Sequence, residues 1–432
     1  MTKQPPPEPP RRKRSRLPRG LAAFKHRNYR LFYFGQLISV TGTWMQTLAQ
    51  SWLVLSLTSS AFLLGLVSVF QFAPMLVLGL FAGLVADRAP KRRLLVCTQA
   101  ISAVLAGTLA ILTFTDTIQL WQIYLLGFLL GVNNAFDMPT RQAFVVEMVG
   151  KDDLPNAIAL NSSLFNAARI VGPAVAGALL AAFGPAVCFA INSVSYIAVI
   201  SGLLMMQVAP LARAQVTQRR LEQIREGLRY VRRTPEILRP VVLVGFVATF
   251  GMNTNIWVPL LAKNDLDGGA SGFGLLMSAM GVGSLIGALG LAFLVTSVKR
   301  WMLFTTAAAL GVGNLILALV GAIPLAIPVA MLVLAGIGLV STTTMAMANT
   351  TVQTAAPDEM RGRIMSVYTT VFTGTAPFGA LIASAIANRF GTPISIMVGG
   401  TVTLLAVIGV LLTGGAKLAV REHLHLPTRR RA

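Results

Sequence analysis

The sequence predicts an all-α protein that crosses a membrane twelve times, with its spans arranged as two six-helix halves. Three observations lead to this fold class. Hydrophobic residues make up 55% of the 432 residues and charged residues only 12%, with a mean hydropathy of +0.70, so charges are too few to cover a water-facing surface. Apolar runs of about 20 residues recur between short polar gaps. Basic residues gather at the ends of these runs.

The twelve apolar runs are predicted to be helices, because lipid offers backbone polar groups no partner outside the segment. They lie near residues 31–57, 62–86, 94–115, 120–146, 156–182, 185–206, 241–262, 272–296, 301–321, 325–350, 362–388 and 393–414. Weak internal similarity divides them into two sets of six: "GPAVAGALLAAFGP" (172–185) has a loose counterpart in "APFGALIASAIANRFGTP" (376–393). Two parallel six-helix halves are a known transporter design.

The polar segments complete the domain organisation. The chain divides into a basic tail that is expected to be disordered, a first half, a linker, a second half and a second basic tail, at residues 1–28, 29–206, 207–240, 241–415 and 416–432. In the linker, Leu221, Ile224, Leu228 and Val231 recur at helical spacing with arginines between them. This pattern predicts an amphipathic helix on the membrane surface, which serves either as a simple connection or as a regulatory element.

Lysine and arginine residues orient the predicted bundle. With both termini on one side, 32 of the 36 basic residues fall on that side. Basic residues concentrate on the cytoplasmic side of membrane proteins, so both tails are predicted to be cytoplasmic in a multi-pass protein of the cell membrane. The net charge of +21 then indicates contact with anionic membrane lipids rather than with nucleic acid, because the bases lie at the ends of the spans.

Cysteine and histidine are too few and too scattered for a disulfide framework or a metal site. Cys97 and Cys188 lie within spans, and His26, His423 and His425 lie in or beside the tails. We therefore expect no metal and no cofactor. A membrane-embedded enzyme would need a catalytic constellation, and none is visible within the spans, so we expect that the protein is not an enzyme.

One acidic residue, Asp137, lies clearly inside a predicted span. An ionisable group inside a membrane is costly and indicates function. Asn133, Asp137 and Arg141 share one face of the fourth span at i, i+4 and i+8, and Arg169 lies midway along the fifth. Asp137 is therefore the candidate for proton coupling, with Arg141 and Arg169 as candidate charge partners. A permanently ionised Asp–Arg pair that holds the fourth and fifth spans together is the alternative.

The stretch "GLVADRAPKRR" (83–93) lies between the second and third spans. It resembles the signature that the major facilitator superfamily carries at this place, roughly G-x-L-a-D-r-x-G-r-k, with Pro90 where the family usually has glycine. The matching residues are Gly83, Asp87, Arg88, Lys91 and Arg92. The resemblance covers residues 20–415 and implies the major facilitator fold.

Other stretches are similar to the enterobactin-exporter-like branch of this superfamily. They are "FKHRNYRLFYFGQLISVTGTWMQTLAQSWLVLSLT" (24–58), "LPNAIALNSSLFNAARIVGPAVAG" (154–177) and "RGRIMSVYT" (361–369). Within the second of them, Gly172, Pro173 and Gly177 resemble the antiporter motif of drug–proton antiporters, with Ala176 in place of one glycine. This resemblance implies export.

The resemblance also implies roles for particular residues. The signature would latch the two halves together, with Asp87 near the start of the eleventh span at Arg361 and Arg88 beside an acid such as Glu147. A carboxylate near a helix start would be stabilised by the helix dipole. The alternative is that the bases only anchor the loop at lipid headgroups.

In this superfamily the first, fourth, seventh and tenth spans line a central cavity. The polar residues of these spans are the candidates for lining it: Thr43, Gln46, Gln50, Asn133, Asn253, Asn255, Asn349 and Gln353. The alternative is that they form hydrogen bonds between helices.

Together, these observations predict a secondary active transporter that exports small amphipathic molecules, such as drugs, siderophores or other secondary metabolites. Proton coupling and alternating access are the expected mechanism, and a monomer is the expected state. An importer or a lysophospholipid flippase on the same fold is the alternative, because the sequence does not reveal direction. A membrane-embedded enzyme is a remote alternative.

Overall fold

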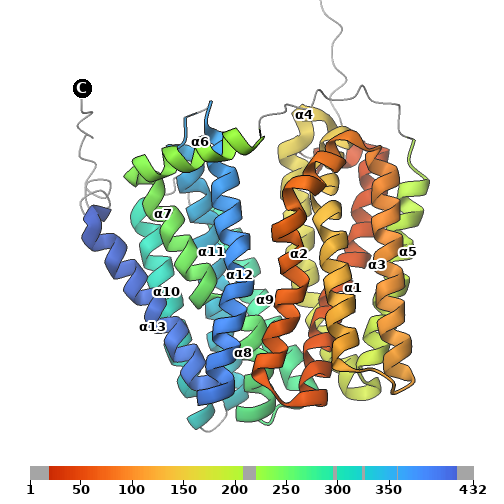
Figure 1. The fold of residues 1–432 in the computed structure, drawn as a ribbon, viewed down its shortest axis with the longest axis vertical. Helices are drawn as coiled ribbons and strands as arrows, with labels where there is room; N and C mark the ends of the chain where they lie inside the picture. The colour runs from red at the N-terminus through yellow and green to blue at the C-terminus, as the bar shows by residue number, and fades with distance from the viewer. Residues whose placement is uncertain (1–18, 208–219, 295–298, 324–325, 358, 416–432) are drawn as a thin grey trace, which may run out of the picture.

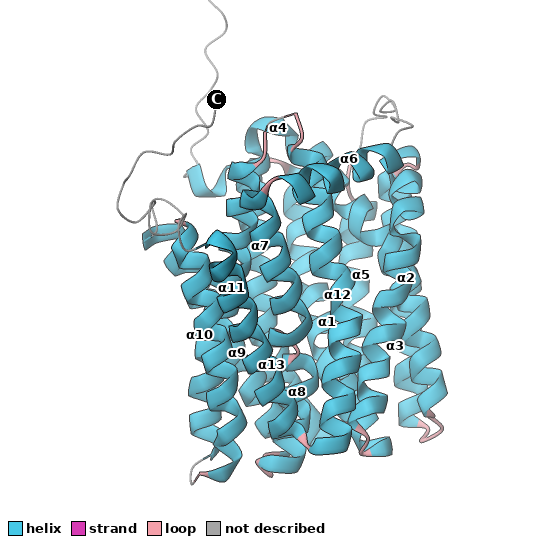
Figure 2. Ribbon diagram, turned by 60° about the vertical axis from the view of Figure 1, so that its left-hand side comes forward, coloured by secondary structure: helices cyan, strands magenta, loops and turns pink. Residues whose placement is uncertain are grey.

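The computed structural model describes residues 19–207, 220–294, 299–323, 326–357 and 359–415. These residues are almost entirely helical and contain no strand (Figure 2). Residues 1–18, 208–219 and 416–432 lie outside the described part, so most of the first predicted tail, all of the second and the first part of the linker are not placed. The all-α, polytopic fold class predicted from the sequence is confirmed.

The N-terminal half makes six passes with five helices. They are α1 (Arg27–Thr58), α2 (Ala61–Arg88), α3 (Lys91–Phe114), α4 (Leu120–Phe183) and α5 (Pro185–Leu204), and the short helix η1 (Arg19–Lys25) precedes them. The 64-residue α4 contains two passes, because Gly150 interrupts it with a φ of 72°. Only glycine adopts this backbone conformation without strain.

The C-terminal half also makes six passes. The first is a broken helix that runs through α7 (Pro235–Phe246), η2 (Val247–Gly251), α8 (Thr254–Leu260) and η3 (Leu261–Asp265). The others are α9 (Gly269–Leu294), α10 (Arg300–Leu319) with η4 (Val320–Ala322), α11 (Ala326–Ala355), α12 (Arg361–Phe390) and α13 (Thr392–Val410) with η5 (Leu411–Gly415). The η2, η3 and η5 segments are π-helical turns, which often occur at functional sites.

Ten segments among the described residues are long and apolar enough to cross a membrane by themselves. The two passes outside this set are α1 and the first pass of α4. Both contain buried polar side chains, such as Gln46 and Gln50 in α1 and Asn133 and Asp137 in α4. These two passes depend on neighbouring helices to satisfy their polar groups within the membrane.

The linker helix α6 (Arg220–Arg233) lies across one end of the C-terminal half (Figure 1). Its Glu226 forms an ion pair of 2.5 Å with Arg363 at the start of α12. A Cβ atom on Gly227 would lie 2.8 Å from the Arg363 carbonyl oxygen, so the helix packs closely on α12. We call this end of the bundle the linker end and the opposite end the far end.

The two halves meet where α4 packs against α9 and α2 packs against α12, and we call this contact the seam. A Cβ atom on Gly177 of α4 would lie 2.7 Å from the Cα atom of Gly274 in α9. The two backbones therefore touch through paired glycines, as in other membrane helices that pack through small residues. This close approach lies near the far end, because α4 ends and α9 begins there.

Candidate functional site

Hydrogen-bond donors surround the carboxylate of Asp137 on the first pass of α4. Its Oδ1 accepts hydrogen bonds from Thr98 Oγ1 at 2.7 Å and from Gln99 Nε2 at 2.8 Å. Its Oδ2 accepts hydrogen bonds from two nitrogens of the Arg141 guanidinium, the Nε at 3.0 Å and a terminal nitrogen. Asp137 is only 3% exposed. The carboxylate is therefore held between α3 and α4 in a buried, fully paired position.

Arg141 extends this cluster to α1, because its other terminal nitrogen donates a hydrogen bond to Gln36 Oε1. The cluster of Asp137, Arg141, Thr98, Gln99 and Gln36 thus joins three helices of the N-terminal half. Sequence reasoning identified the Asp–Arg pair from its i, i+4 spacing but missed the other three members. Their signal was available, because each is a polar residue within an otherwise apolar run.

Arg169 does not join this cluster, which differs from the expectation that it is a charge partner of Asp137. It lies on the second pass of α4, and its guanidinium donates to Asn166 Oδ1 at 2.8 Å and to Thr342 Oγ1 at 3.4 Å. Thr342 belongs to α11 in the other half. Arg169 therefore lies at the seam, because the second pass of α4 turns this face toward the C-terminal half and not toward the first pass.

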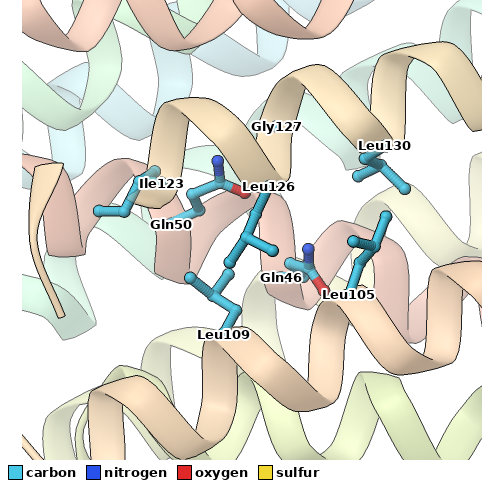
Figure 3. A pocket seen from close by; sticks show the side chains of 8 residues that line it. All are labelled: Gln46, Gln50, Leu105, Leu109, Ile123, Leu126, Gly127 and Leu130. Atoms are coloured by element: carbon cyan, nitrogen blue, oxygen red, sulfur yellow. The ribbon is translucent and has the colours of Figure 1, made fainter. Parts of the chain in front are cut away.

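Three of the expected cavity-lining residues face the interior of the N-terminal half instead. Gln46 and Gln50 of α1 lie among leucines of α3 and α4 around a small hollow (Figure 3). Gln46 also accepts a hydrogen bond of 2.7 Å from Asn192 in α5. Asn133 donates to the Thr98 carbonyl oxygen at 2.9 Å and to Ser102 Oγ at 2.8 Å. Gln46 and Asn133 therefore connect helices, which is the alternative that the sequence left open.

The other candidates differ in their exposure. Asn253 is buried and donates to the Thr249 carbonyl oxygen of its own pass. Thr43, Asn255 and Gln353 are exposed, and Asn349 is half-buried. Gln353 donates to Asn349 Oδ1 at 2.5 Å, so the two side chains form one polar group on α11.

The signature between α2 and α3 makes its described contacts within the N-terminal half. Lys91 forms an ion pair of 2.6 Å with Glu147, the acid that the sequence suggested for Arg88. Arg92 donates to the carbonyl oxygens of Leu203 and Leu204, both at 2.6 Å, at the end of α5. A cation at a helix C-terminus is favourable because it meets the negative end of the helix dipole.

Arg88 is exposed and Gly83 is buried. The side chain of Asp87 lies outside the described part, so its expected contact with the start of α12 stays a prediction.

The antiporter-like motif lies where the second pass of α4 touches its neighbours. A Cβ atom on Gly172 would lie 2.6 Å from the Trp44 Cβ of α1, and Gly177 touches Gly274 across the seam. Pro173 is buried between them. The motif therefore serves close helix packing on both sides of this pass.

The broken pass of the C-terminal half is a feature that sequence reasoning missed. The helix stops after Gly251, and Asn314 of α10 donates a hydrogen bond of 3.0 Å to the Gly251 carbonyl oxygen. This bond satisfies a backbone group that the break would otherwise leave unpaired within the membrane. Discontinuous helices of this kind occur near binding sites in transporters.

Comparison with known proteins gave consistent matches along the chain. The family model described as "transmembrane secretion effector" matches residues 19–429. The staphyloferrin A transporter of Staphylococcus aureus is 25% identical over 400 residues, which cover 91% of this chain and 98% of that protein. The multidrug efflux pump Tap of Mycolicibacterium fortuitum is 28% identical over 393 residues, which cover 88% of this chain and 95% of that protein.

Solved structures show the same fold at low sequence identity. A POT family transporter crystallised with 5-aminolevulinic acid has a TM-score of 0.74 and 10% identity, covering 91% of this chain and 96% of that chain. The nucleoside transporter NupG has a TM-score of 0.71 and 11% identity, covering 92% and 99%. At this identity, the similarity concerns the fold.

Proposed function

Because the chain belongs to the transmembrane secretion effector family of the major facilitator superfamily, we propose that this multi-pass membrane protein exports small molecules as a secondary active transporter. The family match over residues 19–429 carries the proposal, since it takes in both six-pass halves. The names of two relatives, a staphyloferrin A transporter and a multidrug efflux pump, support a small molecule as the cargo. A membrane-embedded enzyme has no such support.

Alternating access is the proposed mechanism, with the two halves rocking about the seam as units. Hydrogen bonds between the halves occur near the far end, where Ser60 of α2 contacts Asn388 of α12 at 3.0 Å and Lys263 donates to the Leu55 carbonyl oxygen of α1. These contacts support a conformation in which the far end is closed. Opening them while the linker end closes would carry the cargo across.

Proton coupling at Asp137 is the second part of the proposal. The carboxylate is buried, and one of its oxygens is bound to the partly exposed Arg141. A proton on Oδ2 would replace a hydrogen bond from the guanidinium, so protonation would loosen Arg141 from Asp137. The link from Arg141 to Gln36 would pass this change to α1. The opposing possibility is that the pair stays ionised and only holds α1, α3 and α4 together.

The test is transport of a fluorescent amphipathic dye by purified protein in liposomes. Dye movement driven by an imposed pH gradient is compared with dye exchange at equal pH on both sides. For coupling through Asp137, we expect the Asp137→Asn variant to lose gradient-driven transport and to keep exchange at equal pH. Asp116→Asn is the matched control, because Asp116 is an exposed carboxylate at the far end.

Each outcome has a distinct meaning. Normal gradient-driven transport by Asp137→Asn would exclude the coupling role. Loss of both activities together with a lower melting temperature would assign the pair a purely structural role. Reversing the pH gradient in vesicles of known orientation separates an exporter from an importer or a lysophospholipid flippase.

We also propose that the linker end faces the cytoplasm, as the distribution of basic residues predicts. The exposed arginines of α6 support this orientation and a contact with anionic headgroups: Arg225, Arg229, Arg232 and Arg233. A cysteine in place of Arg225 should be protected from a membrane-impermeant thiol reagent in intact cells. Labelling from outside would contradict the orientation. The protein is proposed to work as a monomer.

A further inference from the structure

We infer that Arg169 at the seam binds a carboxylate group of the transported molecule, so that the cargo is a small organic anion. The inference deepens the proposed export function and rests on it. Arg169 lies near the middle of a membrane-spanning segment, Asp152–Phe183. A Cβ atom on Gly281 of α9 would lie 2.9 Å from the Arg169 carbonyl oxygen, so this part of α4 packs directly on the C-terminal half.

The charge of Arg169 has no counterpart among the described residues. The ion pairs found there join Lys25 and His26 to Asp153, Lys91 to Glu147, Arg141 to Asp137, and Arg363 to Glu226. Arg169 instead contacts the neutral side chains of Asn166 and Thr342. Its Nε atom is buried and has no hydrogen-bond partner among the described residues.

A cation in this position is costly unless an anion is available to it. Charged groups within a membrane are rare, and those that occur face the interior of the bundle or a water-filled space and mark substrate pathways. Arg141 meets this requirement with Asp137, an acid of its own helix. For Arg169, the anion would come from outside the chain, and a transported molecule that reaches the seam is such a source.

Polar side chains connect Arg169 with the linker end along both halves. On α4, Asn166 and Ser162 precede Arg169 by three and seven residues and share its helix face. On α11, Asn349 and Gln353 follow Thr342 by seven and eleven residues and share the face that contacts Arg169.

The exposure of these side chains indicates what they face. Ser162 and Gln353 are exposed, and Asn166 and Asn349 are half-buried. Polar groups on faces that two helices turn toward each other are expected to meet water rather than lipid. The proposed route from the linker end to the guanidinium would run along these two faces.

The chemistry of the site favours a carboxylate. A guanidinium presents its donors in a planar fork that matches the two oxygens of a carboxylate, and the paired form is stronger than a neutral hydrogen bond. One cation balances one negative charge, whereas a phosphate dianion would need a second. The hydroxyl of Thr342 and the amide of Asn166 lie beside the fork and could donate to the same anion. Because Thr342 belongs to the other half, an anion can contact both Thr342 and Arg169 only while the seam is closed. The affinity for the anion would therefore depend on the conformation of the transporter.

The test measures binding directly and does not depend on transport. Detergent-purified full-length protein is heated with a panel of amphipathic aryl carboxylates, each paired with its neutral primary amide, beginning with naphthoate and naphthamide. We expect the carboxylates to raise the melting temperature and the amides to have little effect. Arg169→Gln should abolish the shift. Arg169→Lys keeps the positive charge but not the planar guanidinium, and it should raise the Kd for the carboxylate by about tenfold or more.

Arg389→Gln is the control, because it removes an exposed arginine that lies over the ring of Phe390, outside the proposed site. If Arg169→Gln does not fold, the preference for carboxylate over amide is measured in Arg169→Lys and in the wild type. A smaller preference in Arg169→Lys supports the inference, and an equal preference contradicts it. Equal binding of amides and carboxylates, an unchanged shift in a folded Arg169→Gln, or no binding of any carboxylate by the wild type would overturn the inference. If the protein binds carboxylates at Arg169 but does not export the dye, the proposed export function is wrong and the binding site at Arg169 still stands.

Discussion

The polar contacts inside the N-terminal half are tighter than most of those that cross the seam. Inside the half, Asp137, Asn133 and Asn192 form buried side-chain hydrogen bonds of 2.7–2.9 Å to neighbouring helices. Across the seam, Ser278 reaches the Ile170 carbonyl oxygen at 3.3 Å and Arg169 reaches Thr342 at 3.4 Å. Buried groups with short hydrogen bonds hold a rigid unit together, whereas longer bonds are easier to exchange.

Small residues carry much of the remaining contact across the seam. Gly177 and Gly274 bring two backbones together without interlocking side chains. Such a surface separates without a large loss of side-chain packing. The difference suggests how one chain can hold each half rigid and still let the halves move.

The largest expected effect follows from breaking the rigid cluster. Asp137→Ala would leave the partly buried Arg141 without its counter-charge, and we expect the free energy of unfolding to fall by about 3 kcal/mol. Reversible unfolding in mixed detergent micelles measures this change. The double variant Asp137→Ala, Arg141→Met removes both charges and should recover most of the loss. A single variant as stable as Glu359→Ala, an exposed control, would show that the pair does not hold the helices together.

A smaller effect is expected at the glycine contact of the seam. A leucine at position 177 cannot fit against the Gly274 backbone, and overpacking of this kind costs about 1–3 kcal/mol. Because the seam can open, Gly177→Leu should shift the conformation rather than unfold the protein. Spin labels at the exposed positions Phe62 and Phe390, near the far end of α2 and α12, should move apart. Gly290→Leu is the control, because a Cβ atom there meets nothing within 4 Å.

The smallest effect is expected at Lys263. Its ammonium group donates to the Leu55 carbonyl oxygen and lies 3.5 Å from Ser59 Oγ, at the C-terminal end of α1. A cation there contributes about 0.3–1 kcal/mol, so Lys263→Met should lower the ratio of closed to open far ends by about two- to fivefold. The same spin labels report the change. High salt should reduce the difference between the variant and the wild type, and a salt-independent difference would contradict an electrostatic origin.

Sequence reasoning identified the site best where the contact was local. Asp137 and Arg141 lie on one continuous helix, so their spacing alone predicted that they meet. Arg169 was expected to join them, but it lies on a different pass whose rotation depends on packing against α9 and α11. Gln46 and Asn133 were correctly recognised as polar residues within spans, yet their direction was set by Asn192 and by α3.

The all-α class, the number of passes and the family signature can all be read from the sequence. Crossing a hydrocarbon layer is a requirement on length and apolarity along the chain, and both can be counted in one dimension. Which face each helix turns to its neighbours depends on the packing of the whole bundle, and this packing leaves Arg169 between the halves with neutral partners. Rotation of a membrane helix about its axis is set by the packing of adjacent helices, which no single segment encodes.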